Sequence, residues 1–342
     1  MVMRVAIVGC GAIGKKRMKA LAPHHLVAVA DKDRRRAAAL TAGIPGCRVE
    51  ADWHPVVAAK DVDAVVVATT NDALATVTQA AVEHGKHVLV EKPAARNTAE
   101  LAGVAAEAGA AGICVKVGFN HRFHPAFVRA RTLIDAGELG PLMYIRARYG
   151  HGGRLGYDRE WRANPAIAGG GELLDQGIHL IDLSRWFLGE FIEVRGQLGT
   201  FFWDMPVEDN GFVCLTTRDG QVAWLHASCT EWKNTFCFEI FGRHGKLQVD
   251  GLGGSYGVER LTFYRMLPQM GPPETTIWEY PGDDVSWRDE FAHFADCIAQ
   301  KRTPSGSLED SSAALAIVEE VYKQSTHKHC RSVADRELRI AI

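Results

Sequence analysis

The chain has 342 residues, is close to electrical neutrality and has the composition of an ordinary globular protein. It carries 39 Lys plus Arg against 41 Asp plus Glu, so no overall positive field attracts a polyanion such as a nucleic acid. The first apolar run, residues 5–8, is too short for a membrane span or a signal segment. We expect a cytoplasmic protein that binds a small molecule, and the length favours two domains.

The first third of the chain alternates short β-branched runs with Ala-rich amphipathic stretches. The strand-like runs are VAIVG, LVAVAD, DAVVVATT, HVLVEKP and ICVKVGF, all between residues 3 and 119. Continuous apolar strands separated by crossover helices are typical of a parallel sheet that is covered on both faces. This α/β pattern predicts a Rossmann dinucleotide-binding domain over residues 1–120.

The pattern changes after residue 119. Helices are expected over residues 125–136 and 173–187, with the strand-like LMYIRARYG between them. Runs of period two follow, including GFVCLTTRDGQVAWLHA, in which Asp219 and Gly220 form a hairpin-turn signal. Two amphipathic helices are expected over residues 287–300 and 308–324. Residues 121–342 are therefore predicted to form an α+β domain with a large, mainly antiparallel open sheet.

A glycine-rich segment, GCGAIG, follows the first strand directly and opens a helix. In this setting Gly9 permits a tight turn, Gly11 lets a pyrophosphate approach backbone N–H groups, and Gly14 allows close packing of helix on strand. Ala12 and Ile13 belong to the same loop and are expected to contact the cofactor with it. Strand, glycines and helix in this order indicate a dinucleotide site.

The next strand ends at Asp31, at the distance from the glycines that the dinucleotide fingerprint requires. A carboxylate there accepts hydrogen bonds from ribose hydroxyls and repels a 2′-phosphate, which favours NAD. Three arginines, residues 34–36, follow closely. Because a guanidinium can pair with a 2′-phosphate, NADP remains possible.

Polar residues follow three further strands, at the carboxyl ends where such a sheet binds ligands. Thr69 and Asn71, in ATTND, are expected near the nicotinamide half of the cofactor, together with Glu91 of VEKP. Lys92, next to Glu91, is placed to donate to a substrate hydroxyl oxygen and to stabilise developing alkoxide charge. The alternative for Lys92 is a surface lysine in a loop.

The segment GGGELLDQGIHLIDLSRW, residues 169–186, carries the other candidate catalytic groups. Asp175, His179 and Asp182 are spaced i, i+4 and i+7, which predicts one helical face. An imidazole between carboxylates suits a general base that removes a hydroxyl proton. Zinc binding is a competing possibility that lacks a third ligand at familiar spacing, so no metal is expected. The structural alternative is a polar helix face that caps a domain interface.

The loop YGHGGRLGYDREWR precedes this helix and is rich in groups that recognise hydroxyls and anions. It can supply hydrogen bonds and an apolar platform to a polyol ring, and its arginines would also suit a phosphate or nucleotide tail. The alternative is an interface loop. The candidate substrate-binding residues are His151, Arg154, Tyr157, Trp161 and Arg162.

The five motifs GCGAIG, ATTND, VEKP, GFNHRF and GGGELLDQGIHLID, in this order, resemble those of the Gfo/Idh/MocA family of oxidoreductases. The resemblance implies that Lys92, Asp175 and His179 form the catalytic set, and that the bond from Lys92 to Pro93 is cis. It further implies a subunit that associates through the open sheet, as a homodimer or homotetramer.

Two further segments bear on the resemblance. Asn120 and Arg122 match the family's aromatic-Asn-x-Arg segment, which lines the cleft between cofactor and substrate, although loop position alone equally suits hinge hydrogen bonds. The chain departs from the family where it has Thr70 and Leu74 in place of a frequent proline and histidine, which affects the cofactor loop.

The expected function is hydride transfer between NAD(P) and a secondary alcohol or ketone carbon of a sugar, sugar nucleotide or cyclitol such as inositol. One alternative is NAD-dependent glycoside cleavage with transient oxidation of a ring carbon. A second alternative is a ligand sensor that kept the fold and lost the chemistry. No nucleic-acid or membrane partner is expected.

Overall fold

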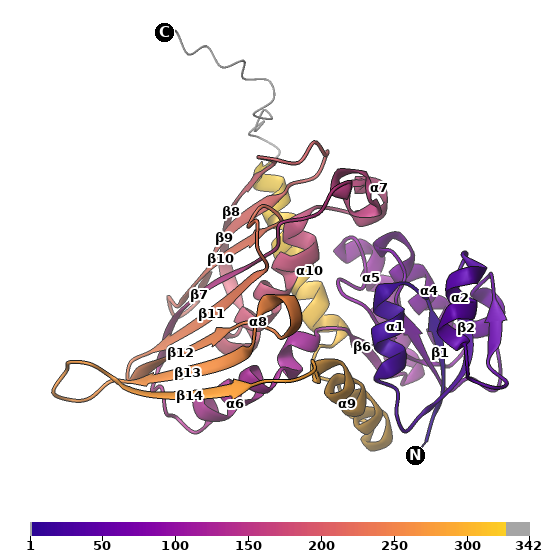
Figure 1. Cartoon of the computed structure of the whole chain (residues 1–342), viewed down its shortest axis with the longest axis horizontal. Helices are drawn as coiled ribbons and strands as arrows, with labels where there is room; N and C mark the ends of the chain where they lie inside the picture. Colours follow the sequence, from indigo (N-terminus) through magenta and orange to yellow (C-terminus); the bar gives the residue numbers. More distant parts are fainter. Residues whose placement is uncertain (1, 326–342) are drawn as a thin grey trace, which may run out of the picture. The chain divides into compact units, whose positions relative to one another are not determined.

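The computed structural model describes residues 2–325, which divide into two compact units (Figure 1). Within these limits, unit 1 comprises residues 2–123 and 285–315, and unit 2 comprises residues 124–284 and 316–325. The main boundary lies near the expected position, but residues 285–315 return to unit 1 rather than staying with the second domain. They do so because Phe291, Phe294 and Ile298 pack into the same core as the first strands.

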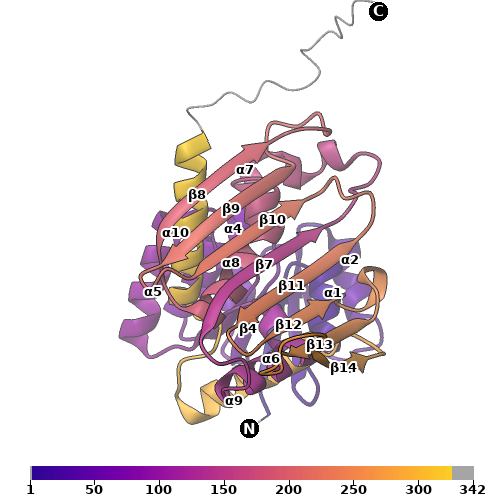
Figure 2. The same ribbon diagram turned by 90° about the vertical axis from the view of Figure 1, so that its left-hand side faces the viewer.

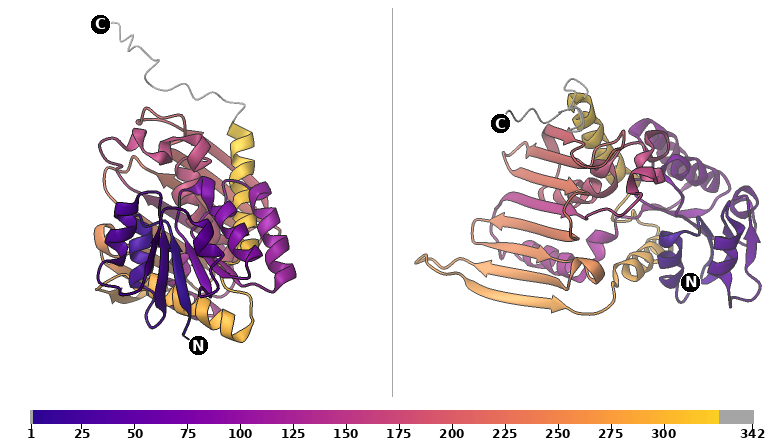
Figure 3. Two further views of the ribbon diagram at one scale, coloured as in Figure 1. Left: turned by 90° about the vertical axis from the view of Figure 1, so that its right-hand side faces the viewer. Right: turned by 45° about the horizontal axis from the view of Figure 1, so that its top comes forward.

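Unit 1 is built on a parallel sheet of six strands in the order β3-β2-β1-β4-β5-β6 (Figure 3, left). The strands are β1 Arg4–Val8, β2 His25–Ala30, β3 Arg48–Glu50, β4 Ala64–Val67, β5 His87–Val90 and β6 Val115–Val117. The helices are α1 Ala12–Lys19, α2 Arg34–Thr41, α3 His54–Val57, α4 Asn71–Glu83, α5 Thr98–Ala111 and α9 Ser286–Gln300, with the short η1 Asn120–Phe123. This architecture confirms the predicted Rossmann fold.

Unit 2 contains an eight-stranded sheet in the order β14-β13-β12-β11-β7-β10-β9-β8 (Figure 2). Every neighbouring pair is antiparallel except β7 and β10, which run parallel. The strands are β7 Leu142–Gly150, β8 Phe191–Gly199, β9 Asn210–Thr217, β10 Val222–Ser228, β11 Thr235–Gly242, β12 Gly245–Asp250, β13 Glu259–Arg265 and β14 Glu274–Tyr280. The expected large, mainly antiparallel sheet is confirmed.

Helices α6 Pro125–Asp135 and α8 Ile178–Leu188 pack on one face of this sheet. Phe127 of α6 and Phe187 of α8 meet the strand residues Phe236 and Phe238 there. Helix α10 Leu308–Ser325 begins in unit 1 and ends in unit 2. Short helical segments α7 Pro165–Ala168, η2 Tyr157–Arg159, η3 Trp161–Ala163 and η5 Gly254–Tyr256 complete the unit.

The helix expected over residues 173–187 is not uniform. Its first part, η4 Leu173–Gly177, is a π-helix, and α8 follows from Ile178. Single π-turns of this kind are frequent at functional sites. Asp175 lies on the π-turn and His179 lies in the first turn of α8, so the two candidate catalytic residues belong to two helix types.

No helix among residues 2–325 is long and apolar enough to cross a membrane. Seven of the eight cysteines lie in this range and are free thiols, three of them buried.

The sheet face of unit 2 opposite the helices exposes large apolar side chains, including Tyr144, Phe212 and Trp224, the last with 59% of its surface accessible.

Candidate active site

The glycine-rich loop has the shape of a dinucleotide cradle. Gly9 adopts φ of 97°, and a Cβ at this position would lie 2.3 Å from the carbonyl oxygen of Ala68. A Cβ at Gly14 would lie 2.1 Å from the carbonyl oxygen of Gly9. At Gly11, by contrast, a Cβ would meet none of the described atoms within 4 Å, and α1 begins at the next residue, Ala12. This open approach to a helix N-terminus fits a pyrophosphate.

Asp31 follows β2 directly, and its carboxylate contacts the backbone of the glycine-rich loop. Its Oδ2 accepts a hydrogen bond of 2.7 Å from the N–H of Cys10, and its Oδ1 accepts one of 2.8 Å from the N–H of Asp33. A carboxylate has about four lone-pair sites, so both oxygens retain capacity for ribose hydroxyls. Of the nearby arginines, Arg36 pairs with Asp33 at 3.3 Å on the surface.

The ATTND segment forms the turn into α4. The hydroxyl of Thr69 donates to the carbonyl oxygen of Thr70 at 3.1 Å, and Asn71, the first residue of α4, is buried. The hydroxyl of Thr70 donates to Asp72 at 2.6 Å, which ties the first turn of the helix. Leu74, at the position where the family often has histidine, is fully buried and serves the core of unit 1.

The VEKP segment is a constrained turn after β5. The bond from Lys92 to Pro93 is cis, as the resemblance implies, and Ala94 adopts φ of 69°. The N–H of Ala94 donates to the carbonyl oxygen of Glu91 at 2.9 Å, and the hydroxyl of Ser311 donates to the carbonyl oxygen of Pro93 at 2.7 Å. Lys92 is half-buried at the tip of this turn. The carboxylate of Glu91 is held by Arg17 at 2.6 Å.

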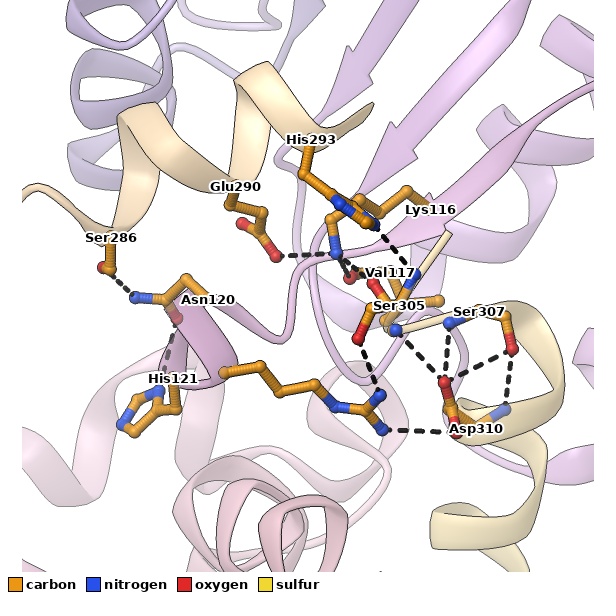
Figure 4. A network of polar contacts seen from close by, with 12 residues as sticks. Lys116, Val117, Asn120, His121, Ser286, Glu290, His293, Ser305, Ser307 and Asp310 are labelled. Carbon is orange, nitrogen blue, oxygen red and sulfur yellow. Dashed lines mark hydrogen bonds and ion pairs between the residues drawn. The ribbon is translucent and has the colours of Figure 1, made fainter. Parts of the chain in front are cut away.

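Asn120 and Arg122 are both buried in unit 1. Figure 4 shows Asn120 within a polar network. The amide of Asn120 donates to the hydroxyl of Ser286 at 2.9 Å. Arg122 donates to the hydroxyl of Ser305 at 3.1 Å and pairs with Asp310 at 3.2 Å. These contacts give both residues a structural part, and ligand binding by either one stays a prediction.

In unit 2, the candidate catalytic segment carries an ion pair. The Nε of Arg162 donates to Oδ2 of Asp175 at 2.9 Å. His179 and Asp182 are 4% and 1% exposed, so both side chains are buried. The ring of Tyr149, from β7, lies 6.3 Å from the ring of His179. Sequence reasoning did not single out this buried tyrosine, whose pKa is raised well above its ordinary value by burial.

The loop before this segment is held by its own side chains. Nδ1 of His151 accepts from the N–H of Gly153 at 2.9 Å, and burial lowers the pKa of His151, so the ring is neutral at pH 7. The ring of Tyr157 meets that of His151 edge-on at 5.4 Å. Arg154 pairs with Glu160 at 2.6 Å on the surface.

The indole of Trp161 completes this loop by stacking on a candidate substrate residue. Its ring centre lies 4.5 Å from the guanidinium of Arg162, the residue that also holds Asp175. Trp161 and Arg162 are both partly exposed. The structure therefore joins these two candidate residues to Asp175, and Glu160 lies within ion-pair distance of both Arg154 and Arg162.

Glu208 is a residue of this region that sequence reasoning missed. Its carboxylate accepts from the N–H of Gly171 at 3.0 Å, the N–H of Leu173 at 3.1 Å and the hydroxyl of Tyr322 at 2.9 Å. It thereby holds the start of the π-turn that bears Asp175. Burial raises the pKa of Glu208 to about 7. The contact joins residues 35 positions apart, and no local pattern marks it.

A dinucleotide cradle on a parallel sheet, followed by an α+β unit with an open sheet, defines a two-domain NAD-binding oxidoreductase. The family model for the NAD-binding Rossmann fold of this oxidoreductase family matches residues 3–119, and the model for the GFO/IDH/MocA C-terminal domain matches residues 127–248. The chain belongs to the Gfo/Idh/MocA family, as its motifs indicated.

Curated relatives and solved structures agree with this assignment. The chain is 35% identical over 262 residues to inositol 2-dehydrogenase 4 of Saccharopolyspora erythraea, covering 74% of this chain and 75% of the relative. It is 32% identical over 254 residues to dTDP-3,4-didehydro-2,6-dideoxy-alpha-D-glucose 3-reductase of Streptomyces violaceoruber, covering 72% of each. A solved levoglucosan dehydrogenase in complex with NADH superposes with a TM-score of 0.82 at 25% identity, covering 95% of this chain and 98% of that one.

Proposed function

We propose that this protein is an NAD-dependent dehydrogenase acting on a ring secondary hydroxyl of a cyclitol or free sugar, or on the corresponding ketone. The observation that carries the proposal is the pairing, in one chain, of a dinucleotide cradle with a buried histidine that follows a π-turn bearing a carboxylate. Relatives named for inositol and levoglucosan support this substrate class.

Each candidate group has a defined part in this reaction. The ammonium of Lys92 donates to the substrate hydroxyl oxygen and stabilises the alkoxide charge that develops on it. The imidazole of His179 takes the hydroxyl proton, or returns it in the reverse direction. Asp175 binds or orients substrate with a carboxylate that Arg162 fixes at 2.9 Å. The bound nicotinamide supplies the site that gains or loses the hydride.

The charge pairing of the substrate loop favours an uncharged polyol over a phosphorylated or nucleotide-linked sugar. Arg154 and Arg162, the two arginines suited to an anionic tail, are paired with Glu160 and Asp175. An incoming phosphate would have to displace these carboxylates or meet their repulsion. Neutral His151 and the partly exposed face of Trp161 suit hydroxyls and the apolar face of a ring.

The test is absorbance at 340 nm while the protein, with NAD and separately with NADP, is offered inositols, free sugars and sugar nucleotides. Reduction of NAD by inositols or free sugars is expected. The His179→Asn variant should be slower by about two to four orders of magnitude. As a control, His54→Asn replaces a histidine whose side chain is 67% exposed and should keep the normal rate.

Two results would overturn the proposal. Turnover of a glycoside without accumulation of reduced cofactor would establish the cleavage reaction instead. Tight ligand binding with no turnover in either direction would establish a sensor. A normal rate in His179→Asn would remove this residue from the chemistry and would require another acid/base.

We also propose that the protein self-associates through the open sheet face of unit 2, as a dimer or tetramer. Tyr144, Phe212 and Trp224 expose a large apolar area on this face, beside the charge pair of Arg146 and Glu239. Exposed apolar patches of this kind mark association surfaces, and a second copy supplies both the apolar and the charged complement. Light scattering after size-exclusion chromatography tests this proposal.

The matched variants for this measurement lie on opposite sides of unit 2. Trp224→Arg should convert the assembly to monomers. Val128→Arg, at an apolar residue of α6 with 48% exposure, should leave the assembly intact. A wild-type protein that elutes as a monomer would refute self-association.

A further inference from the structure

Unit 1 contains a buried row of four charged side chains with alternating sign. Nε of Arg17 lies 2.6 Å from Oε1 of Glu91, and Nη1 of Arg17 lies 2.5 Å from Oε2 of Glu290. The other oxygen of Glu290 lies 3.1 Å from Nζ of Lys116. Figure 4 shows the Glu290 and Lys116 end, where α9 meets β6. Arg17, Glu290 and Lys116 are fully buried, so solvent does not screen the row.

An aromatic ring and a glycine enclose Arg17, in addition to its two carboxylate partners. Its guanidinium lies 4.5 Å from the centre of the Trp287 ring. A Cβ added at Gly118 would lie 2.7 Å from Nη2 of Arg17, so this glycine admits the side chain. The planar fork of an arginine can bridge two carboxylates in fixed directions, whereas a lysine ammonium acts as a point charge. The site therefore selects arginine for geometry as well as for charge.

Buried ion pairs add little net stability compared with apolar residues of similar volume, because desolvation offsets their attraction. Their value is positional, since each partner fixes the other. Here the fixed element is the turn that bears Lys92. Glu91 precedes Lys92, its N–H donates to the carbonyl oxygen of Val67 at 2.9 Å, and its side chain is clamped by Arg17. Ser311 holds the carbonyl oxygen of Pro93 on the other side of Lys92.

We propose that Arg17 and Glu290 are positioning residues for Lys92, linking the lysine turn to the helix that begins at the dinucleotide loop. Arg17 lies on α1, which starts at Ala12 immediately after Gly11. The row thus links α1, which begins at the cofactor cradle, to the Lys92 turn and to α9. The inference rests on the proposed role of Lys92 in the reaction, and the experiment separates the two.

The test uses three variants of the full-length protein. Glu290→Gln keeps the shape and removes one charge, and Arg17→Lys keeps the charge and removes the fork. Lys86→Met is the matched control, because Lys86 is also a buried lysine of unit 1, bonded to the carbonyl oxygens of Ala59 and Val62. Because its ammonium is bonded to these two carbonyl oxygens and not to the row, this variant should lower stability without affecting Lys92.

Two readouts are compared. The first is the pH-dependent rate of Lys92 acetylation by acetic anhydride without NAD, resolved by mass spectrometry against the other lysines. The second is kcat and KM with the substrate that the absorbance assay at 340 nm selects from the panel. In Glu290→Gln and Arg17→Lys, the rate of Lys92 acetylation should change by about threefold or more. The kcat of both variants should fall about 10- to 100-fold, since misplacement of a catalytic group by about 1 Å can cost 10²-fold in rate. KM for NAD should stay within about twofold, because uniform cofactor binding is not removed.

The outcomes distinguish the inference from the proposed function. If both variants lose thermal stability while the acetylation profile of Lys92 and kcat match those of Lys86→Met, the row is merely structural and the inference is overturned. If the Lys92 profile changes but kcat does not, the positioning is supported and the catalytic role of Lys92 is refuted. If Arg17→Lys fails to fold, Glu290→Gln alone decides between these results.

Discussion

Replacing Glu208 by glutamine should remove a specific pH dependence of stability. In the folded protein burial raises the pKa of this carboxyl from its ordinary 4.5 to about 7. Between these values the folded protein keeps a proton that the unfolded chain releases, so the free energy of unfolding decreases as pH rises through this window. At about 1.4 kcal/mol per pH unit, the decrease from this group is about 3 kcal/mol.

The glutamine amide also lowers the free energy of unfolding by an amount that does not depend on pH. Two oxygens of Glu208 accept hydrogen bonds, one from Gly171 and the other from Leu173 and Tyr322. In glutamine an NH2 group replaces one oxygen and faces a donor, which costs about 1–3 kcal/mol for an unsatisfied buried group. Glu208→Gln should therefore be less stable than the wild type at pH 5, and this deficit should shrink or reverse by pH 8.

Urea unfolding of both proteins, followed by tryptophan fluorescence at half-unit steps from pH 4.5 to pH 8, measures this difference. The contributions of other titrating groups cancel when the free energy of unfolding of the variant is subtracted from that of the wild type. Tyr322→Phe is a second check, since losing the hydroxyl that stabilises the carboxylate should raise the pKa of Glu208 further. A difference that stays constant across the pH range would refute the reasoning.

Three other outcomes are expected. Gly9→Ala should weaken NAD binding by more than about tenfold, measured by calorimetry, because the positive φ and a Cβ 2.3 Å from the carbonyl oxygen of Ala68 force the loop to move. Asp31→Ala should weaken NAD binding by about 10- to 100-fold and NADP binding less, and an unchanged preference would count against its ribose role. Glu259→Ala should lower the free energy of unfolding by about 1–3 kcal/mol, seen in denaturant titration, because its carboxylate accepts a 2.6 Å bond from the N–H of Ala126 at the start of α6.

The fold class and the motif positions could be predicted because they are encoded locally. The helix expected over residues 125–136 is observed as Pro125–Asp135, and the one over 308–324 as Leu308–Ser325. Asp31 follows the strand end as its spacing indicated.

The supporting residues of the site could not be predicted because their contacts are long-range. Arg17 meets Glu91 and Glu290, which are 74 and 273 positions away, and each residue alone reads as a surface charge on an amphipathic helix or loop. The π-turn at Leu173–Gly177 was missed because a sequence with helical spacing does not reveal one wider turn. The long range of its core contacts also explains why α9 was assigned to the second domain.

The parallel pairing of β7 with β10 has a consequence for how this protein can acquire new substrates. The pairing runs from Tyr144 and Val222 to Gly150 and Ser228, so it fixes both ends of a long crossover. Residues 151–164, which carry the candidate substrate side chains, form a loop within that crossover. We expect exchange or lengthening of this loop to leave the register of the sheet unchanged, because the β7–β10 pairing ends at Gly150. Unit 2 can therefore serve as a scaffold on which substrate range evolves, or is engineered, by replacing one loop.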